Sequence, residues 1–182
     1  MIASLPSGPF DVILADPPWR FSANSAARPG RTVHRHYPTM TVEEVAAMPV
    51  GDVAARAALL LLWTTAPLRE ATMHVPRAWG FRFKSELIWD KGKLGLGCWC
   101  RNEHETLLIC TRGRFPCPRP LFPFSILRSP RREHSRKPDE VQDQLDALYG
   151  DRPRLEIFAR QERPGWTCWG NDTGRFMAEG AA

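Results

Sequence analysis

Short apolar runs recur along the chain and alternate with segments rich in proline, glycine and charge. The runs Val12–Ala15 and Ala58–Trp63 are apolar at every position, which is typical of strands buried on both faces of a sheet. Phe81–Asp90 places apolar residues at alternate positions, and His104–Thr111 is again mainly apolar. We therefore predict four strands in the first two thirds of the chain, with a glycine-rich loop over Lys91–Cys100.

Helix signals fall between these strands. Thr41-Val42-Glu43-Glu44 forms a capping box, which predicts a short helix that stops before Pro49. Pro67 suits the first turn of a helix running toward Trp79, within which Pro76 must kink or shorten the helix. Pro138–Tyr149 has the pattern of an amphipathic helix, and Gly150 ends it.

The last third of the chain predicts three more strands, at Ser125–Leu127, Leu155–Ala159 and Trp166–Trp169. Strands separated by helices favour an α/β fold, and we predict a Rossmann-like, doubly wound, mostly parallel sheet. A length of 182 residues suits one domain, 1–182, with a core at about 10–172.

Asp16-Pro17-Pro18-Trp19 follows the first apolar run directly, so Asp16 falls at the carboxyl end of a strand, where α/β proteins bind ligands. Two consecutive prolines fix the backbone, and the Pro17 carbonyl need not accept a hydrogen bond from a neighbouring strand. A carboxylate beside a carbonyl can accept both N–H bonds of an exocyclic amine, and Trp19 could stack on the base. The alternative is a tight turn with Asp16 as its cap.

The later segments extend this motif. ADPPWRF is followed in order by GLGCWCRNEHETLLICTRG, RKPDEV, LEIFAR and GWTCWGN. Together they resemble the MT-A70 family of S-adenosyl-L-methionine-dependent adenine methyltransferases, and the small bacterial and phage members most. The resemblance spans about Asp11 to Asn171. It implies that Asp16, Pro17, Pro18 and Trp19 form the catalytic segment.

The resemblance also implies a cofactor site. Lys137 would meet the cofactor carboxylate beside a helix N-terminus. Glu156 at the end of a late strand would serve the hydroxyls or ammonium, with Phe158 near the sulfonium; Arg160 stands where most related enzymes carry glycine. Alternatively, Glu156 simply ends a core strand and Lys137 is a loop lysine. The implied cofactor-binding residues are Asp16, Lys137, Glu156, Phe158, Arg160, Asn171 and Asp172.

On the substrate side, Glu105 corresponds to the family's acid that faces the target adenine. Trp99 and Asn102 lie close to it in sequence and could line the same mouth, while His104 is equally well explained as a satisfied histidine at a strand end. Arg20 and Arg35 belong to a basic loop at about 20–40 that contains no acid, and a second basic loop at about 112–137 has eight basic residues against Glu133 alone. The expected substrate-binding residues are Trp19, Glu105, Arg20, Arg35, Trp99 and Asn102.

A net charge of +5 suits a polymer with a phosphate backbone. We therefore expect methylation of adenine N6 in DNA, and no residue separates this hypothesis from the same reaction on RNA. A non-catalytic nucleic-acid-binding subunit and a protein amine methyltransferase are the remaining alternatives. Five cysteines without the usual zinc-ligand spacing predict reduced thiols and no metal site. We also expect a cytoplasmic location, no membrane segment, and a possible homodimer or heterodimer.

Overall fold

The computed structural model describes residues 4–20, 39–95, 97, 99–117, 120–133, 136–171 and 173–174. Within them, seven strands form one sheet in the order β5-β3-β4-β2-β1-β6-β7. The strands are β1 (Phe10–Ala15), β2 (Ala54–Thr64), β3 (Arg82–Asp90), β4 (His104–Arg112), β5 (Ile126–Arg128), β6 (Arg154–Ile157) and β7 (Trp166–Trp169). The helices are α1 (Val42–Ala46), α2 (Val50–Val53), η3 (Ala66–Leu68), α3 (Arg69–Thr72), α4 (His74–Ala78) and α5 (Glu140–Tyr149).

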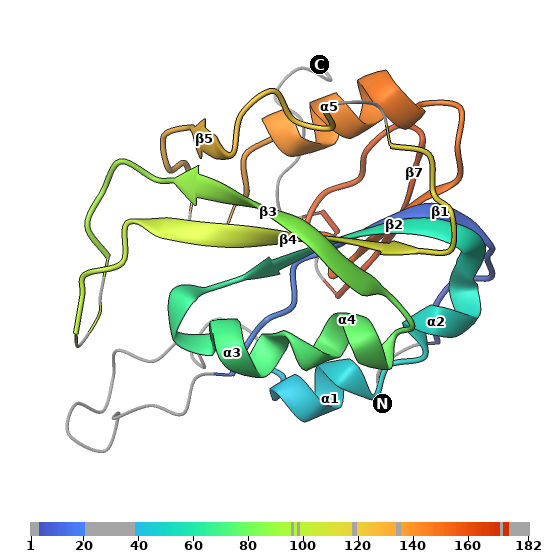
Figure 1. Ribbon diagram of the computed structural model, residues 1–182, viewed down its shortest axis with the longest axis horizontal. Coiled ribbons are helices and arrows are strands. Elements are labelled where there is room, and N and C mark those ends of the chain that lie inside the picture. Colours follow the sequence, from blue (N-terminus) through green and yellow to red (C-terminus); the bar gives the residue numbers. More distant parts are fainter. Residues whose placement is uncertain are drawn as a thin grey trace.

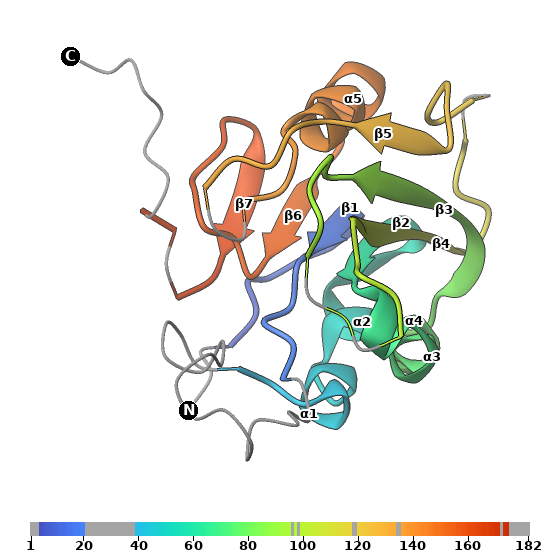
Figure 2. The same ribbon diagram turned by 90° about the vertical axis from the view of Figure 1, so that its left-hand side faces the viewer.

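Helices cover both faces of this sheet. Figure 1 shows α1, α2, α3 and α4 on one side and α5 on the other, and the turned view in Figure 2 shows the same three layers. The predicted doubly wound, Rossmann-like α/β fold is confirmed. In the described parts of the chain, no helix is long and apolar enough to cross a membrane.

The sheet is mixed, because β4 runs against the other six described strands. β1 is parallel to β2 and β6, and β6 to β7, but β4 is antiparallel to both β2 and β3. β3 and β5 are parallel again. The prediction of a mostly parallel sheet is therefore confirmed. The prediction did not include the reversed strand, β4.

The central strands are buried on both faces, as their continuous apolar runs predict. Leu60 and Leu62 of β2 pack with the α1 and α4 side of the core, while Leu59, Leu61 and Trp63 pack with the α5 side. Strand β2 starts at Ala54, four residues earlier than predicted, because Ala54 pairs with Phe10 of β1 before the register between the two strands shifts.

The helices follow the local signals with one interruption. The Thr41 hydroxyl accepts from the Glu44 amide at 3.1 Å and the Glu44 carboxylate accepts from the Thr41 amide at 2.7 Å, so the capping box of α1 is confirmed. The helix predicted from Pro67 to Trp79 is instead three short pieces, η3, α3 and α4. Pro76 cannot donate to the Thr72 carbonyl, and α3 ends at Thr72. The single turn α2 has no counterpart in the prediction.

Candidate active site

The candidate site lies where the carboxyl ends of β1, β2 and β6 meet the start of β4. Asp16 is the first residue after β1, and its amide donates to the Ile157 carbonyl at the end of β6 at 3.3 Å. Because β4 is reversed, its second residue, Glu105, lies just beyond the Thr64–Thr106 pair that ends β2. Two carboxylates from distant segments thus reach one edge of the sheet.

Lys137 joins these two carboxylates. Its Nζ lies 2.7 Å from Asp16 Oδ2 and 3.3 Å from Glu105 Oε2, and it stands over the Trp63 ring at 5.7 Å from the centroid. Lys91, the first residue after β3, adds a second cation, with Nζ 3.3 Å from Glu105 Oε1. The side chains of Asp16, Lys137 and Glu105 are only 15%, 18% and 20% exposed. The result is a half-buried chain of alternating charges, Asp16–Lys137–Glu105–Lys91.

Electrostatic attraction within this chain of charges favours the charged forms of Lys137 and Glu105. Burial alone would lower the pKa of Lys137, but the attraction of Asp16 and Glu105 outweighs burial and raises that pKa. Burial would likewise raise the pKa of Glu105, but Lys137 and Lys91 outweigh it and the pKa is lowered. The site therefore holds the ionised Glu105 carboxylate against the Lys137 ammonium at neutral pH.

A cavity opens beside this charge chain, between β1, β6 and the start of α5. Glu156 of β6 lines it, and the Gln142 side-chain amide donates to Glu156 Oε2 at 2.9 Å. Burial raises the pKa of Glu156 to about 7, while the hydrogen bond from Gln142 acts in the opposite direction. The lining residues are Leu14, Asp16, Trp63, Arg136, Lys137, Pro138, Asp139, Val141, Gln142, Glu156, Phe158, Arg160 and Gln161.

A tight turn after β6 shapes one end of the cavity. Phe158 has a φ of +67°, a left-handed conformation that costs a non-glycine residue free energy. Its ring meets Trp169 of β7 edge to face at 5.9 Å, and the Ala159 amide donates to the Trp169 carbonyl at 3.0 Å. A Cβ on Gly170 would lie 2.4 Å from the Ala159 oxygen, so only glycine allows β7 to approach this turn so closely.

Five of the residues predicted for the cofactor or for catalysis come together here: Asp16, Lys137, Glu156, Phe158 and Arg160 all line the cavity. Lys137 connects them to Glu105, which was predicted for the substrate.

The rest of the D-P-P-W segment lies partly in the core. The Pro17 carbonyl accepts from the Trp19 amide at 2.8 Å, and the Pro18 carbonyl accepts from the Met40 amide at 2.8 Å. Trp19 is 6% exposed and its indole N–H donates to the Trp63 carbonyl at 3.0 Å, so its ring packs among the core residues on the α1 side. Its proposed stacking on a base stays a prediction.

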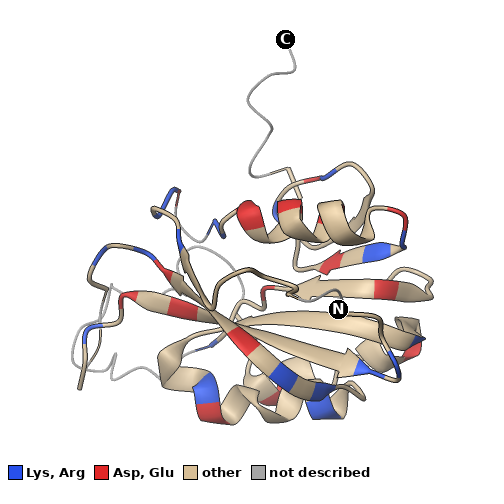
Figure 3. Cartoon of the chain, turned by 45° about the horizontal axis from the view of Figure 1, so that its top comes forward, with Lys and Arg blue, Asp and Glu red and all other residues tan. Residues whose placement is uncertain are grey.

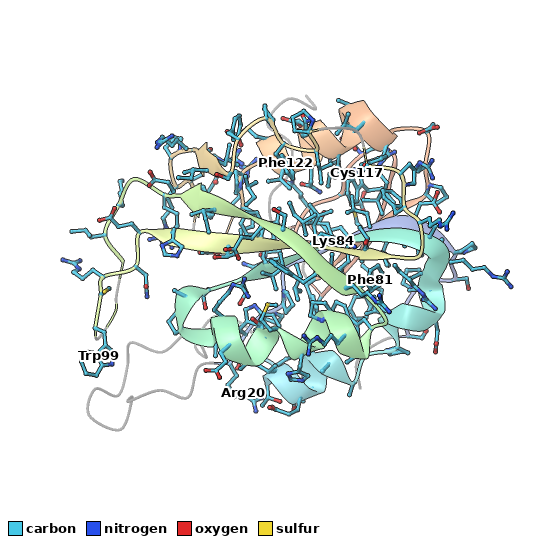
Figure 4. The ribbon with its side chains drawn as sticks, in the orientation of Figure 1. Arg20, Phe81, Lys84, Trp99, Cys117 and Phe122 are labelled. Carbon is cyan, nitrogen blue, oxygen red and sulfur yellow. The ribbon has the colours of Figure 1, made fainter. Side chains whose placement is uncertain are left out.

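The remaining predicted residues lie apart from the cavity. The Arg20 guanidinium donates to the Thr39 carbonyl at 2.9 Å and lies 3.7 Å from Glu44. Trp99 is fully exposed at the tip of the loop between β3 and β4, and Figure 4 shows it pointing away from the sheet. Asn102, in the same loop, accepts from the Gly95 amide through its backbone oxygen at 2.8 Å, and Asn171 is exposed. Arg35 and Asp172 lie outside the described residues.

Both predicted basic loops are described only in part. Nearly all of residues 20–40 lie outside the described ranges. In the second loop, Arg132 pairs with Asp139 at 2.6 Å, Arg136 with Glu133 at 3.2 Å, and the Arg112 guanidinium donates to the Gly51 carbonyl at 2.6 Å. Figure 3 shows basic and acidic residues mixed along the loops and elements around the sheet. Several of these arginines therefore already have protein partners.

Three residues of the site were not predicted: Trp63, Gln142 and Lys91. Trp63 ends an apolar run, which indicates core and nothing more. Gln142 does leave a signal, because it is a polar residue among the buried positions Val141, Leu145 and Tyr149 of α5. Lys91 looks like an ordinary loop lysine until β3 and β4 are paired.

Among the described residues, no three His, Cys, Asp or Glu side chains gather into a group that could hold a metal ion. The described cysteines, Cys100, Cys110, Cys117 and Cys168, are free thiols, and Cys98 lies outside the described residues. Cys110 is buried in the core, where burial raises the pKa of its thiol to about 12.

Comparison with known proteins gives relatives along nearly the whole chain. A Type II methyltransferase, M.MunI, from a Mycoplasma species is 28% identical over 91% of this chain and 78% of its own length. A probable N(6)-adenosine-methyltransferase MT-A70-like protein from rice is 29% identical, and the human N(6)-adenosine-methyltransferase catalytic subunit METTL3 is 26% identical, each over 90% of this chain. The chain spans only 23% and 28% of the length of these two relatives.

The sequence profile of the MT-A70 family matches residues 10–172. This range begins with β1 and extends past β7, so it contains the whole sheet, the charge chain and the cavity. The chain belongs to the MT-A70 family of methyltransferases, whose methyl donor is S-adenosyl-L-methionine.

Proposed function

We propose that this protein transfers a methyl group from S-adenosyl-L-methionine to N6 of adenine in DNA. The observation that carries the proposal is the position of the Lys137 ammonium, 2.7 Å from Asp16 and 3.3 Å from Glu105. A nitrogen that donates N–H bonds already fits between the two carboxylates. The exocyclic amine of adenine is such a donor. It is neutral and planar, whereas the Lys137 ammonium is charged and tetrahedral.

The chemistry of the cavity fits the cofactor. The Glu156 carboxylate is an acceptor for cofactor hydroxyls, and the cations Lys137 and Arg160 line the cavity where its carboxylate would bind. When bound, S-adenosyl-L-methionine would supply an electrophilic methyl group to the amine nitrogen: the sulfur–methyl bond breaks, the neutral thioether leaves, and the amine gives up one proton.

The protein contributes position and charge. Asp16 accepts an N–H of the target amine, which turns the nitrogen lone pair away from the ring, and Asp16 or water takes the proton that leaves. Glu105 holds the base from the other side of β2, and Lys137 moves toward the cofactor carboxylate to make room for the amine. Catalysis of this kind rests mainly on orientation, which can supply several orders of magnitude in rate.

The comparisons support the choice of target without deciding the polymer. The relatives named N(6)-adenosine-methyltransferases favour adenine N6, and the Type II methyltransferase, of which the chain covers 78%, favours DNA. The same reaction on RNA is the second candidate, favoured by the eukaryotic relatives. A flipped or single-stranded base is the easier target, because extruding a paired base costs a few kcal/mol.

Methyl transfer from labelled S-adenosyl-L-methionine to matched single- and double-stranded DNA and RNA tests the proposal. Nucleoside mass spectrometry should find N6-methyladenine on DNA, and the Asp16→Ala variant should lose it. Asp11→Ala is the matched control, since Asp11 stands on the same strand but pairs with Arg152 at 2.9 Å, away from the site. Product on RNA alone would select the second candidate, and cofactor binding without any product would support the non-catalytic subunit.

We also propose that the protein acts in the cytoplasm and that two copies, or this chain and a relative, associate. Large hydrophobic side chains on the described surface support association: Phe83, Leu94, Trp99, Phe124 and Ile126 are 40% to 100% exposed. Light scattering after gel filtration tests this point, and a monomer at all concentrations would contradict the homodimer.

A further inference from the structure

The Glu156 carboxylate has a hydrogen-bond partner that no family motif contributes. This partner comes from α5, the helix packed above Glu156. Gln142 is 6% exposed, and its side-chain Nε2 donates to Glu156 Oε2 at 2.9 Å. Leu14 of β1 and Cys168 of β7 flank Glu156 in the sheet, so the carboxylate points at α5 from between two apolar or weakly polar neighbours. A buried amide on the apolar face of a helix is retained at a cost, unless it is hydrogen-bonded.

The bond with Gln142 fixes how Glu156 meets the cavity. Gln142 and Glu156 both line it, and one carboxylate oxygen is held by the amide. Gln142 holds Oε2, and we assign the other carboxylate oxygen, Oε1, to the ligand. A carboxylate held in this way presents a single acceptor in a fixed direction, which suits a hydroxyl of a ribose.

We infer that Gln142 is a positioning residue that orients the Glu156 carboxylate toward the hydroxyls of the bound cofactor. This inference rests on the proposed cofactor role of Glu156 and adds a residue to it. Gln142 does not touch the reacting atoms. It acts through Glu156.

The ionisation of Glu156 makes the inference testable. Burial raises its pKa, the hydrogen bond from Gln142 is the strongest influence that lowers it, and the resulting pKa is about 7. Asp16 also raises the pKa, and Arg163 and Arg160 lower it. Cys168 on β7 is the remaining titratable neighbour, and its own thiol pKa is raised. Without the amide donor, Glu156 stays protonated to higher pH, and its acceptor oxygen is lost over that range.

The experiment is calorimetric binding of S-adenosyl-L-methionine to the full chain at several pH values between 6 and 9. Gln142→Leu should bind roughly tenfold to a hundredfold more weakly at neutral pH, as expected when a carboxylate loses a hydrogen bond. The deficit should shrink as pH rises and Glu156 ionises. For Gln142→Glu the deficit in affinity should grow as pH rises, because the introduced carboxyl ionises and repels Glu156.

The matched control is Gln144→Leu. Gln144 lies on the same helix and its Nε2 donates to the Leu121 carbonyl at 2.9 Å, but it does not line the cavity. Its removal should leave cofactor affinity and pH dependence unchanged. The ligand's own titration is common to all variants and cancels in the comparison.

The outcomes separate the inference from the proposed function. If the wild type binds no cofactor, the proposed cofactor role of Glu156 fails. If the wild type binds but Gln142→Leu matches it at every pH, or Gln144→Leu loses as much, the positioning role of Gln142 is wrong. If Gln142→Leu does not fold, the opposite pH slope of Gln142→Glu still decides, since a purely structural loss would weaken binding equally at all pH values.

Discussion

Replacing Lys137 by methionine tests the charge chain directly, because the side-chain stem stays and the ammonium goes. The ammonium lies 2.7 Å from Asp16 and 3.3 Å from Glu105. At an effective dielectric constant of about 20, these separations correspond to attractions of about 6 and about 5 kcal/mol. Dehydration of the three ions offsets most of this, at several kcal/mol per ion.

The net cost follows from what remains after the change. Removing one partner of a buried ion pair destabilises by about 3–5 kcal/mol, since the other charge is left buried. Here two carboxylates are left, but 15% to 20% exposure lets water reach them, so we expect the low end, about 3 kcal/mol. For a protein of this size, that loss lowers the melting temperature by about 6–12 °C.

The loss must depend on pH in a definite direction. The pKa of Glu105 is lowered in the folded state, so its contribution is complete above its unfolded value of 4.5 and disappears as pH falls through the lowered folded pKa. The pKa of Lys137 is raised, so its contribution is complete below its unfolded value of 10.5. Between about pH 5 and 10 the wild type therefore has the full advantage over Lys137→Met.

Urea unfolding at pH 7.5, and at the lowest pH below 4.5 where the wild type still unfolds cooperatively, measures this advantage. Lys84→Met is the matched control, because Lys84 is exposed on β3 (Figure 4) and its change should stay within about 0.5 kcal/mol. A loss for Lys137→Met below about 1 kcal/mol at pH 7.5, or an equal loss at both pH values, would show that the ion pairs of Lys137 do not stabilise the fold.

Three further changes have defined outcomes. Glu156→Gln should raise the free energy of unfolding at pH 8 while weakening cofactor binding. Burial raises the folded pKa of Glu156 to about 7, so the ionised group costs stability above that pH. The gain in stability, measured by urea unfolding, should vanish as pH falls toward 4.5. Gly170→Ala should lower the free energy of unfolding by about 1–3 kcal/mol and weaken cofactor binding, because its Cβ would lie 2.4 Å from the Ala159 oxygen. The control is Gly174→Ala, whose Cβ would have no heavy atom within 4 Å. Equal melting temperatures of the two variants would contradict the close approach at Gly170. Thr41→Ala should cost about 1 kcal/mol by removing the cap of α1, whereas Thr41→Ser should match the wild type in thermal melting.

Local patterns predicted the parts of the fold that local physics determines. The apolar runs of β1 and β2 and the capping box at Thr41 lie where the sequence places them, since each depends on neighbouring residues only. The reversal of β4 depends on which strand lies beside which, and the runs of His104–Thr111 and Ala58–Trp63 look alike in either direction. Trp99 was misplaced for this reason. Its nearness in sequence to Glu105 predicted that both residues line the mouth of one site, but the loop between two antiparallel strands carries Trp99 outward.

The site divides in the same way. Asp16 at a strand end follows from the chain itself, whereas its partner Lys137 is 121 positions away and entered only through the family resemblance. Gln142 was missed because an amphipathic helix tolerates an occasional polar residue, and nothing in α5 reveals that Glu156 stands opposite. Trp19 was assigned to the substrate from its motif, and the structure adds the bond to the Trp63 carbonyl, which only the packing of β1 against β2 creates.

The reversed strand explains why this edge of the sheet can hold an amine at all. β2 lies between β1 and β4, so the backbones that carry Asp16 and Glu105 are two strand spacings, about 10 Å, apart. That separation is too wide for one carboxylate pair to share a proton but wide enough for a nitrogen donor between the two side chains, where Lys137 now lies above Trp63. If β4 ran parallel, its other end would reach this edge, and Thr111, the second residue from that end, would stand where Glu105 does. A neutral hydroxyl there would leave Lys137 without its second carboxylate, so the direction of one strand decides the charge of the site.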